Sequence, residues 1–136
     1  RELTGHRGAI KRVAWLRDGK RLLSTGDDGW VHVWDPLSGE ELHRLEGHTS
    51  WIEGVATGPG GLVVTAGGDR GLRAWDAVAG RPLRVFEEGV GDLTSVAVNP
   101  QGTLAASGAA DGTFRLWDIA TGRQVFRHEG RNTVQD

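Results

Sequence analysis

The chain contains the dipeptide Trp-Asp three times, at Trp34-Asp35, Trp75-Asp76 and Trp117-Asp118, at intervals of 41 and 42 residues. Each dipeptide closes a block of similar sequence, and the blocks fill almost the whole chain of 136 residues. Self-similarity at a fixed period is typical of proteins that copy one supersecondary unit in series, because a single copy is too small to bury its apolar face. The period therefore predicts stacked copies of one unit.

Every block contains four short runs separated by glycine-rich turns. The runs expected to form strands are Ile10–Trp15, Leu22–Thr25, Val31–Trp34 and Leu42–Leu45 in the first block, Ile52–Thr57, Leu62–Ala66, Leu72–Trp75 and Leu83–Phe86 in the second, and Leu93–Val98, Leu104–Ser107, Phe114–Trp117 and Gln124–Phe126 in the third. The second run of each block is nearly all apolar or small, which suits a strand covered on both faces. The third run alternates with period two, as a half-buried strand does. With 22 glycines at the turns and no helical period, the sequence predicts an all-β meander.

Composition excludes several classes of function. The 16 basic and 18 acidic side chains are intermixed and give a net charge of −2, so a nucleic-acid partner is not favoured. The chain has no cysteine, which excludes disulfides, thiolate zinc sites and a cysteine nucleophile. No window approaches 18 consecutive apolar residues, so no membrane segment or membrane partner is expected.

Four strands per block, with Gly5-His6 or Gly47-His48 leading and Trp-Asp closing, resemble the WD-repeat (WD40) β-propeller family, whose period is about 40–45 residues. The resemblance implies blades at residues 5–46, 47–87 and 88–128, with residues 129–136 starting a fourth repeat. Propellers typically need about four to eight blades to close a ring. We therefore expect a partial β-propeller, an open arc of three four-stranded antiparallel blades. The expected excerpt would contact the remaining blades of the same protein, with a homo-oligomer as the alternative.

In the WD40 family, a buried hydrogen-bonded network links the His of Gly-His, a Ser or Thr of the second strand, an Asp of the next turn and the Trp of the third strand. The matching positions are His6, Ser24, Asp28 and Trp34 in block one, His48, Thr65, Asp69 and Trp75 in block two, and Ser107, Asp111 and Trp117 in block three. A buried indole N–H needs an acceptor, which the hydroxyl supplies, and the carboxylate can accept from the imidazole. The His position of block three falls on Gly89 or Val90, so its network is expected to be incomplete or closed by water.

A His, a hydroxyl residue and an Asp also compose a nucleophilic triad. Here the hydroxyl is expected to face a Trp from an internal strand, and the chain has neither a Gly-x-Ser-x-Gly elbow nor an oxyanion loop. No catalytic residue, metal or cofactor is therefore expected. His32, His43 and His128 match no zinc or calcium spacing and are expected to be solvated at the surface. Two placements of the Trp30 side chain are open: it packs against the fourth strand, or it is exposed.

WD40 propellers are similar in being rigid, usually non-catalytic platforms that hold partners on the top face. The contact positions that the resemblance implies are Ala9, Lys11 and Asp27 in block one, Trp51, Glu53 and Gly68 in block two, and Asp92, Thr94 and Ala110 in block three. This patch combines one aromatic anchor with both signs of charge, which suits a polar peptide better than a phosphate backbone. Two functions remain open: a scaffold for a protein or peptide partner, and a non-catalytic propeller region of a larger enzyme such as a kinase or hydrolase.

Overall fold

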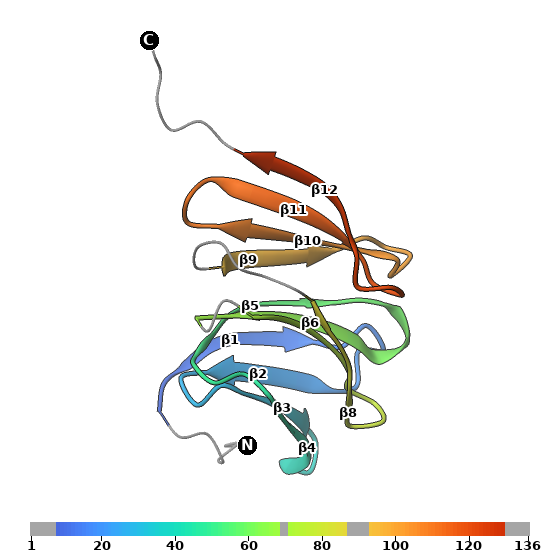
Figure 1. Cartoon of the computed structure of the whole chain (residues 1–136). Coiled ribbons are helices and arrows are strands. Elements are labelled where there is room, and N and C mark those ends of the chain that lie inside the picture. Colours follow the sequence, from blue (N-terminus) through green and yellow to red (C-terminus); the bar gives the residue numbers. More distant parts are fainter. Residues whose placement is uncertain (1–7, 69–70, 87–92, 130–136) are drawn as a thin grey trace.

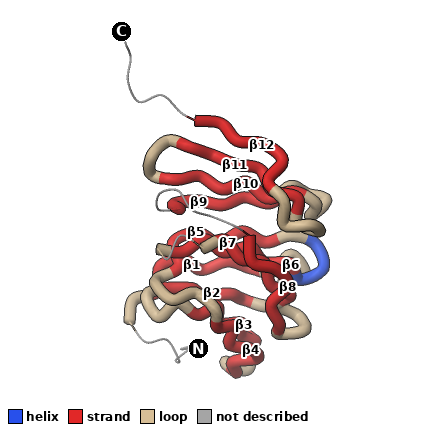
Figure 2. The backbone as a smooth tube through the Cα atoms, in the orientation of Figure 1, coloured by secondary structure: helices blue, strands red, loops and turns tan. Residues whose placement is uncertain are grey.

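A computed structural model describes residues 8–68, 71–86 and 93–129. These residues form three four-stranded antiparallel sheets, here called blades 1, 2 and 3. Blade 1 contains β1 (Ile10–Trp15), β2 (Leu22–Gly26), β3 (Trp30–Asp35) and β4 (Glu40–Glu46); blade 2 contains β5 (Ile52–Thr57), β6 (Leu62–Gly67), β7 (Leu72–Asp76) and β8 (Arg81–Phe86); blade 3 contains β9 (Leu93–Val98), β10 (Leu104–Ala109), β11 (Thr113–Asp118) and β12 (Gln124–Glu129). Strand order within each sheet follows the chain, which confirms the all-β meander (Figure 2).

The described residues contain one short helical turn, η1 (Pro59–Gly61), in the loop between β5 and β6. Within the described ranges, no helix has the length and apolar character needed to cross a membrane.

The Asp of each Trp-Asp pair builds the turn that follows the third strand. The Asp35 carboxylate accepts the backbone N–H of Leu37 at 2.9 Å, and Asp76 and Asp118 make the same kind of bond in their own blades. The turn then closes on a glycine with φ near +80°, for example Gly39, which favours a residue without a side chain. The sequence motif therefore encodes the connection from third to fourth strand as well as the buried Trp.

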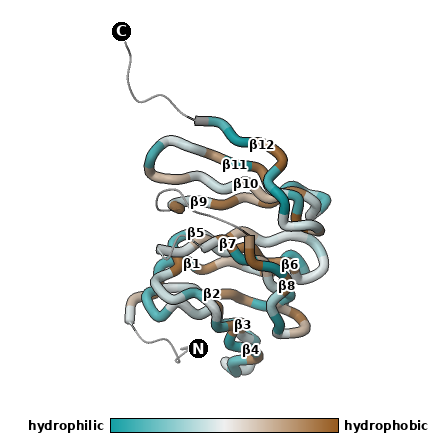
Figure 3. The backbone as a smooth tube through the Cα atoms, in the orientation of Figure 1, coloured by the Kyte–Doolittle hydropathy of each residue, from teal (hydrophilic) through white to brown (hydrophobic). Residues whose placement is uncertain are grey.

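The blades stack face to face, with the first strands of successive blades in contact (Figure 1). Between blades 1 and 2, Trp75 of β7 packs with Val31 and Val33 of β3 in one core cluster. Between blades 2 and 3, Trp117 of β11 packs with Leu72 and other residues of the facing sheet in a second cluster. In Figure 3, brown hydrophobic segments lie on several of the strands that form these interfaces. Trp75 and Trp117 thus each contribute to the core shared with the preceding blade.

Side chains of the fourth strand fasten each blade to the next one. His43 of β4 lies 3.1 Å from the carbonyl oxygen of Val78, and Arg84 of β8 donates to the carbonyl oxygens of Ile119 and Thr121 at 3.0 and 3.2 Å. His43 is half-buried by this contact. The expectation of a solvated His43 was therefore wrong, because the side chain reaches a turn that lies 35 residues away in the chain.

Blade 3 presents an apolar face that no other described blade covers. Phe114 is 42% exposed and Phe126 is 48% exposed, with their ring centroids 5.9 Å apart. By strand register, Phe114 matches the fully buried Val31 of blade 1. Phe126 matches His43, the residue of β4 that contacts blade 2. His128 is exposed, as expected, and its ring lies 5.1 Å from that of Phe114.

Candidate functional site

Blade 2 brings three predicted network residues together in its interior. The indole N–H of Trp75 donates to the Thr65 hydroxyl at 2.8 Å, and Nε2 of His48 lies 2.7 Å from the same oxygen. All three side chains are buried. Asp69, the fourth predicted member, lies outside the described residues. The Thr65 hydroxyl thus joins the loop before β5 to the third strand of the same blade.

Blade 1 makes the same Trp–hydroxyl bond, with the Trp34 indole N–H donating to the Ser24 hydroxyl at 2.8 Å. His32 lies beside this pair, and its ring stacks on Trp34 with centroids 5.7 Å apart. His32 is 0% exposed, so the expectation of a solvated surface histidine was wrong. His32 and Trp34 alternate with Val33 along β3, and both are covered.

His32 is held between two carboxylates. Its Nε2 lies 3.0 Å from the Asp28 carboxylate, and its Nδ1 contacts the Glu41 carboxylate of β4. Carboxylates accept hydrogen bonds, so these two contacts hold the His32 ring between the turn before β3 and the fourth strand of the same blade. His6, the histidine predicted to serve this network, lies outside the described residues. Sequence analysis missed His32 and Glu41 as partners of Asp28.

The Glu41 carboxylate also contacts Arg44, whose guanidinium lies 4.7 Å from the centre of the Trp30 ring. Partial burial raises the pKa of Glu41, but hydrogen bonds from Arg44 and His32 lower it, and the resulting pKa lies below the ordinary value. Trp30 is half-buried beneath Arg44 of the fourth strand, which corresponds to the packed placement of this residue.

Of the predicted network residues in the described part of blade 3, two are joined by a hydrogen bond. The Trp117 indole N–H donates to the buried Ser107 hydroxyl at 3.1 Å. Asp111 is exposed, and its carboxylate accepts the backbone N–H of Thr113 at 2.9 Å, which lowers its pKa. The expectation that Asp111 belongs to the buried network was therefore wrong, because its carboxylate caps its own turn. Gly89 and Val90 lie outside the described residues.

The geometry around these hydroxyls fits structural bonds better than nucleophilic catalysis. Ser24, Thr65 and Ser107 are buried and accept hydrogen bonds from indole N–H groups, whereas a nucleophile needs access to a substrate. Across residues 8–68, 71–86 and 93–129, no group of three or more His, Asp or Glu residues is arranged to hold a metal ion.

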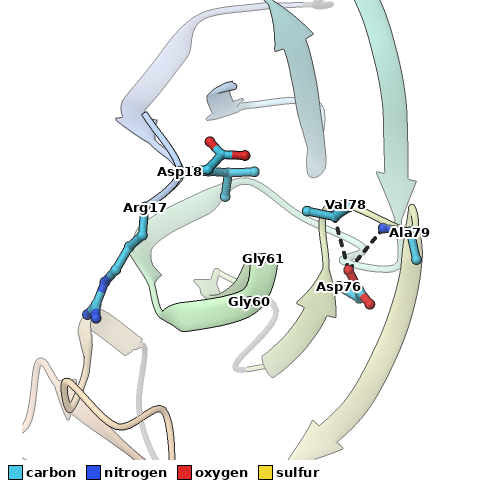
Figure 4. Close-up of a pocket in the computed structure, with 8 residues that line it drawn as sticks. Arg17, Asp18, Gly60, Gly61, Asp76, Val78 and Ala79 are labelled. Atoms are coloured by element: carbon cyan, nitrogen blue, oxygen red, sulfur yellow. Dashed lines mark hydrogen bonds between the residues drawn. The ribbon is translucent and has the colours of Figure 1, made fainter. Parts of the chain in front are cut away.

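A cavity of about 400 Å³ lies between the β1–β2 turn of blade 1 and the turns of blade 2 (Figure 4). Its carboxylates are engaged by their own turns: Asp76 accepts the amides of Val78 and Ala79 at 3.1 and 2.9 Å, and Asp18 accepts the amide of Lys20 at 2.8 Å. The Lys20 amide, followed by the Arg21 guanidinium, holds the pKa of Asp18 below its ordinary value. Both carboxylates therefore close their own turns.

The predicted contact residues lie where each first strand begins. The pairing of first and second strands skips one residue in every blade, at Lys11, Glu53 and Thr94. Such a β-bulge leaves the extra residue out of the ladder and redirects its side chain. All three bulged residues are among the expected contact positions, and the sequence analysis did not foresee the bulge.

In blade 1 the structure brings Ala9, Lys11 and Asp27 together. The Ala9 carbonyl accepts the amide of Asp27 at 2.9 Å, and the Lys11 ammonium lies 4.0 Å from the Asp27 carboxylate. In blade 3, Thr94 is exposed and its hydroxyl lies 3.4 Å from the carbonyl oxygen of Gly108. Ala110 is also exposed, whereas Asp92 lies outside the described residues.

In blade 2, Trp51 is 44% exposed just before β5. The Gly68 amide donates to the Trp51 carbonyl at 2.8 Å, and a side chain at Gly68 would overlap the indole ring. Glu53 faces Arg12 of blade 1 at 3.8 Å, so the two blades contribute to one surface. The described part of this surface, formed by Lys11, Arg12, Asp27, Trp51, Glu53 and Thr94, is called the top-face patch below.

Comparison with known proteins matches the family model "WD domain, G-beta repeat" (WD40) at residues 1–35, 39–76 and 80–118. The chain is 48% identical over 52 residues to the probable serine/threonine-protein kinase PkwA of Thermomonospora curvata, covering 38% of this chain and 7% of that protein. It is 33% identical over 64 residues to the guanine nucleotide-binding protein subunit beta of Saccharomyces cerevisiae, covering 47% of this chain and 15% of that protein.

Protein HIR1 of Cryptococcus neoformans is 39% identical over 59 residues, covering 43% of this chain and 7% of that protein. The matched stretches therefore span only a small part of each relative. The three repeat matches together include most of the chain, and each ends at the Asp of a Trp-Asp pair. The second and third matches therefore begin with the fourth strand of one sheet and end with the third strand of the next. The chain belongs to the WD40 repeat family.

Proposed function

We propose that this chain is a non-catalytic protein-interaction scaffold whose top-face patch binds a protein or peptide segment. The observation that carries the proposal is the half-exposed Trp51 beside three bulged residues, Lys11, Glu53 and Thr94. Tryptophan is enriched among the residues that dominate binding energy at interfaces. The buried histidines and hydroxyls are used inside the blades, so recognition is assigned to the exposed side chains of the top-face patch.

A phage-displayed library of random 12-residue peptides, selected against the immobilised chain, tests this proposal. We expect selected peptides to lose at least about tenfold in affinity with Trp51→Ala, the size of effect typical of an interface anchor. The melting temperature should change little, because the ring is half-exposed. Trp15→Ala is the matched control, since Trp15 is 53% exposed at the other end of a first strand.

Peptides that bind equally well to the wild type and to Trp51→Ala would contradict the proposed surface. A large loss of melting temperature in Trp51→Ala would show instead that Trp51 belongs to the core.

The similarity to the probable kinase PkwA favours a second candidate function. In this alternative the blades form an accessory or regulatory region of a larger multidomain enzyme whose catalytic domain lies outside the 136 residues. The coding sequence on either side of this stretch distinguishes the two candidates. A kinase or hydrolase domain in the same reading frame favours the accessory role, and further WD40 repeats alone favour the scaffold.

The apolar face of blade 3 supports a proposal about neighbouring blades. At the two internal interfaces, the positions that match Phe114 are Val31 and Leu72, and both are fully buried under the next blade. We propose that another blade of the same protein covers Phe114 and Phe126, with a second copy of the chain as the alternative. The native mass of the chain tests this: a discrete dimer favours self-assembly, whereas aggregation favours a missing blade.

A further inference from the structure

The exposed indole of Trp51 is a fixed platform. One face of the ring lies against Gly68, where no side chain intervenes, and the Gly68 amide bonds the Trp51 carbonyl. The ring makes no aromatic or cation contact, and its N–H no hydrogen bond, with any part of the chain that the structure describes. An aromatic face and an N–H donor are therefore both available to a partner.

Glu53 supplies a carboxylate on the same segment of chain as Trp51. It lies two residues after Trp51, which is about 6–7 Å along an extended strand, and the bulge of β5 takes it out of the ladder. Its side chain is 32% exposed. The closest cation, Arg12, lies 3.8 Å away, which is longer than a hydrogen bond, and Glu53 accepts no hydrogen bond among the described residues. Its oxygens can therefore accept from a partner.

Three kinds of partner side chain can be compared on this site. An apolar side chain would cover the indole but would leave the Glu53 carboxylate desolvated without a new bond. An anion would be repelled by both the indole face and the carboxylate. A guanidinium is planar, stacks on aromatic rings and presents paired donors that match a carboxylate. It satisfies both groups at once.

We infer that the top-face patch recognises an arginine side chain of its partner, which stacks on Trp51 and donates hydrogen bonds to the Glu53 carboxylate. This inference rests on the proposed binding function of the same surface. Arg12 already places a guanidinium beside Glu53, so the incoming arginine extends or replaces a pairing that the surface makes by itself. The Trp51 N–H is left to donate to a backbone carbonyl of the partner segment.

The test uses a capped seven-residue peptide, Gly-Ser-Ala-Arg-Ala-Ser-Gly, with lysine and citrulline versions as controls. Citrulline keeps the shape of arginine but removes the charge. Binding is followed by NMR of the indole N–H signals, of which the chain has six, and the signal lost in Trp51→Phe identifies Trp51. We expect the arginine peptide to shift the Trp51 signal while the signals of the buried Trp34, Trp75 and Trp117 stay in place.

The expected order of affinity is arginine, then lysine, then citrulline, with at least about a threefold loss from arginine to citrulline. Glu53→Gln should weaken the arginine peptide more than the citrulline peptide, whereas Trp15→Phe should change neither. Equal binding of the arginine and citrulline peptides, or no effect of Glu53→Gln, would overturn the inference.

The library selection separates this inference from the proposed function. If selected peptides depend on Trp51 but carry no arginine, the binding function stands and the arginine inference fails. If no selected peptide depends on Trp51, the proposed binding surface itself fails.

Discussion

In blade 2, His48 from the loop before β5 contacts the hydroxyl of the buried Trp–hydroxyl pair, whereas in the described part of blade 1 the histidine beside the pair is His32 of β3, which stacks on Trp34. The Trp–hydroxyl distance is 2.8 Å in both blades. In blade 2 the histidine contacts the hydroxyl, and in blade 1 it bridges two carboxylates. Among the described residues, the same Trp–hydroxyl pair therefore lies beside different polar groups in the two blades, and the buried polar groups named here have hydrogen-bond partners in each.

Blade 1 holds its buried histidine between two carboxylates, so this side chain should be the most costly to remove. In His32→Leu, the Asp28 carboxylate remains buried and loses its contact with the imidazole. Leaving a buried acceptor without its partner costs about 1–3 kcal/mol, and more when the acceptor is charged. We expect a loss of about 3 kcal/mol in the free energy of unfolding, measured by urea denaturation. A loss similar to that of an exposed substitution such as His128→Leu would show that the His32 bridge is not structural.

Blade 2 depends on a hydroxyl that serves two partners. Thr65→Val keeps the shape of the side chain but removes the oxygen that Trp75 and His48 both contact. We expect a loss of about 2 kcal/mol in the free energy of unfolding, since an unsatisfied buried group costs about 1–3 kcal/mol. Ser107→Ala is the matched variant in blade 3, where the hydroxyl meets Trp117, and should cost about half as much. Equal losses would contradict the sharing of the Thr65 oxygen.

The charged network of blade 1 should also make stability depend on pH. Because the folded pKa of Glu41 is lowered, its contribution is present above its ordinary value of 4.5 and is lost as the pH falls through the lower folded pKa. Asp18 and Asp111 also have lowered pKa values, so the wild type is compared with Glu41→Gln. The difference in melting temperature between these two proteins should be largest at neutral pH and should shrink below pH 4.5. A constant difference would contradict the Glu41 pairing.

The smallest expected effect is an increase in the free energy of unfolding instead of a loss. Thr25 is as fully buried as Thr65, but its hydroxyl has no hydrogen-bond partner among the residues that the structure describes. Thr25→Val replaces this hydroxyl with a methyl group of similar size, so we expect a gain of up to about 1 kcal/mol in the free energy of unfolding. Comparing Thr25→Val with Thr65→Val tests whether a hydrogen-bond partner of the hydroxyl decides if the substitution raises or lowers the free energy of unfolding. A loss in both variants would contradict that explanation.

The strands were predictable because each block repeats the same spacing between apolar runs, turns and Trp-Asp. The bonds from Trp75 to Thr65 and from Trp117 to Ser107 follow from the family resemblance and the constant interval between these positions. His32 was not predictable, because alternation shows which side of β3 it occupies but not whether that side is covered. The contact of His43 with the next blade also depends on stacking, which one block does not reveal.

The top-face patch was predicted as a set of positions and not as a geometry. The bulge at Lys11, Glu53 and Thr94 depends on how two strands pair, and strand pairing leaves no composition signal at these residues. The contact between Trp51 and Gly68 likewise joins residues that are far apart in the block. His6, Asp69 and Asp92 lie outside the described residues, so their roles remain predictions.

The central claim is that buried histidines and hydroxyls hold the blades together while the top-face patch binds the partner. The most direct test is the capture of one library-selected peptide by His48→Ala, measured well below its melting temperature. We expect a melting temperature lowered by about 3–6 °C, with capture retained. An unchanged melting temperature together with lost capture, or with a lost hydrolytic activity, would contradict the claim.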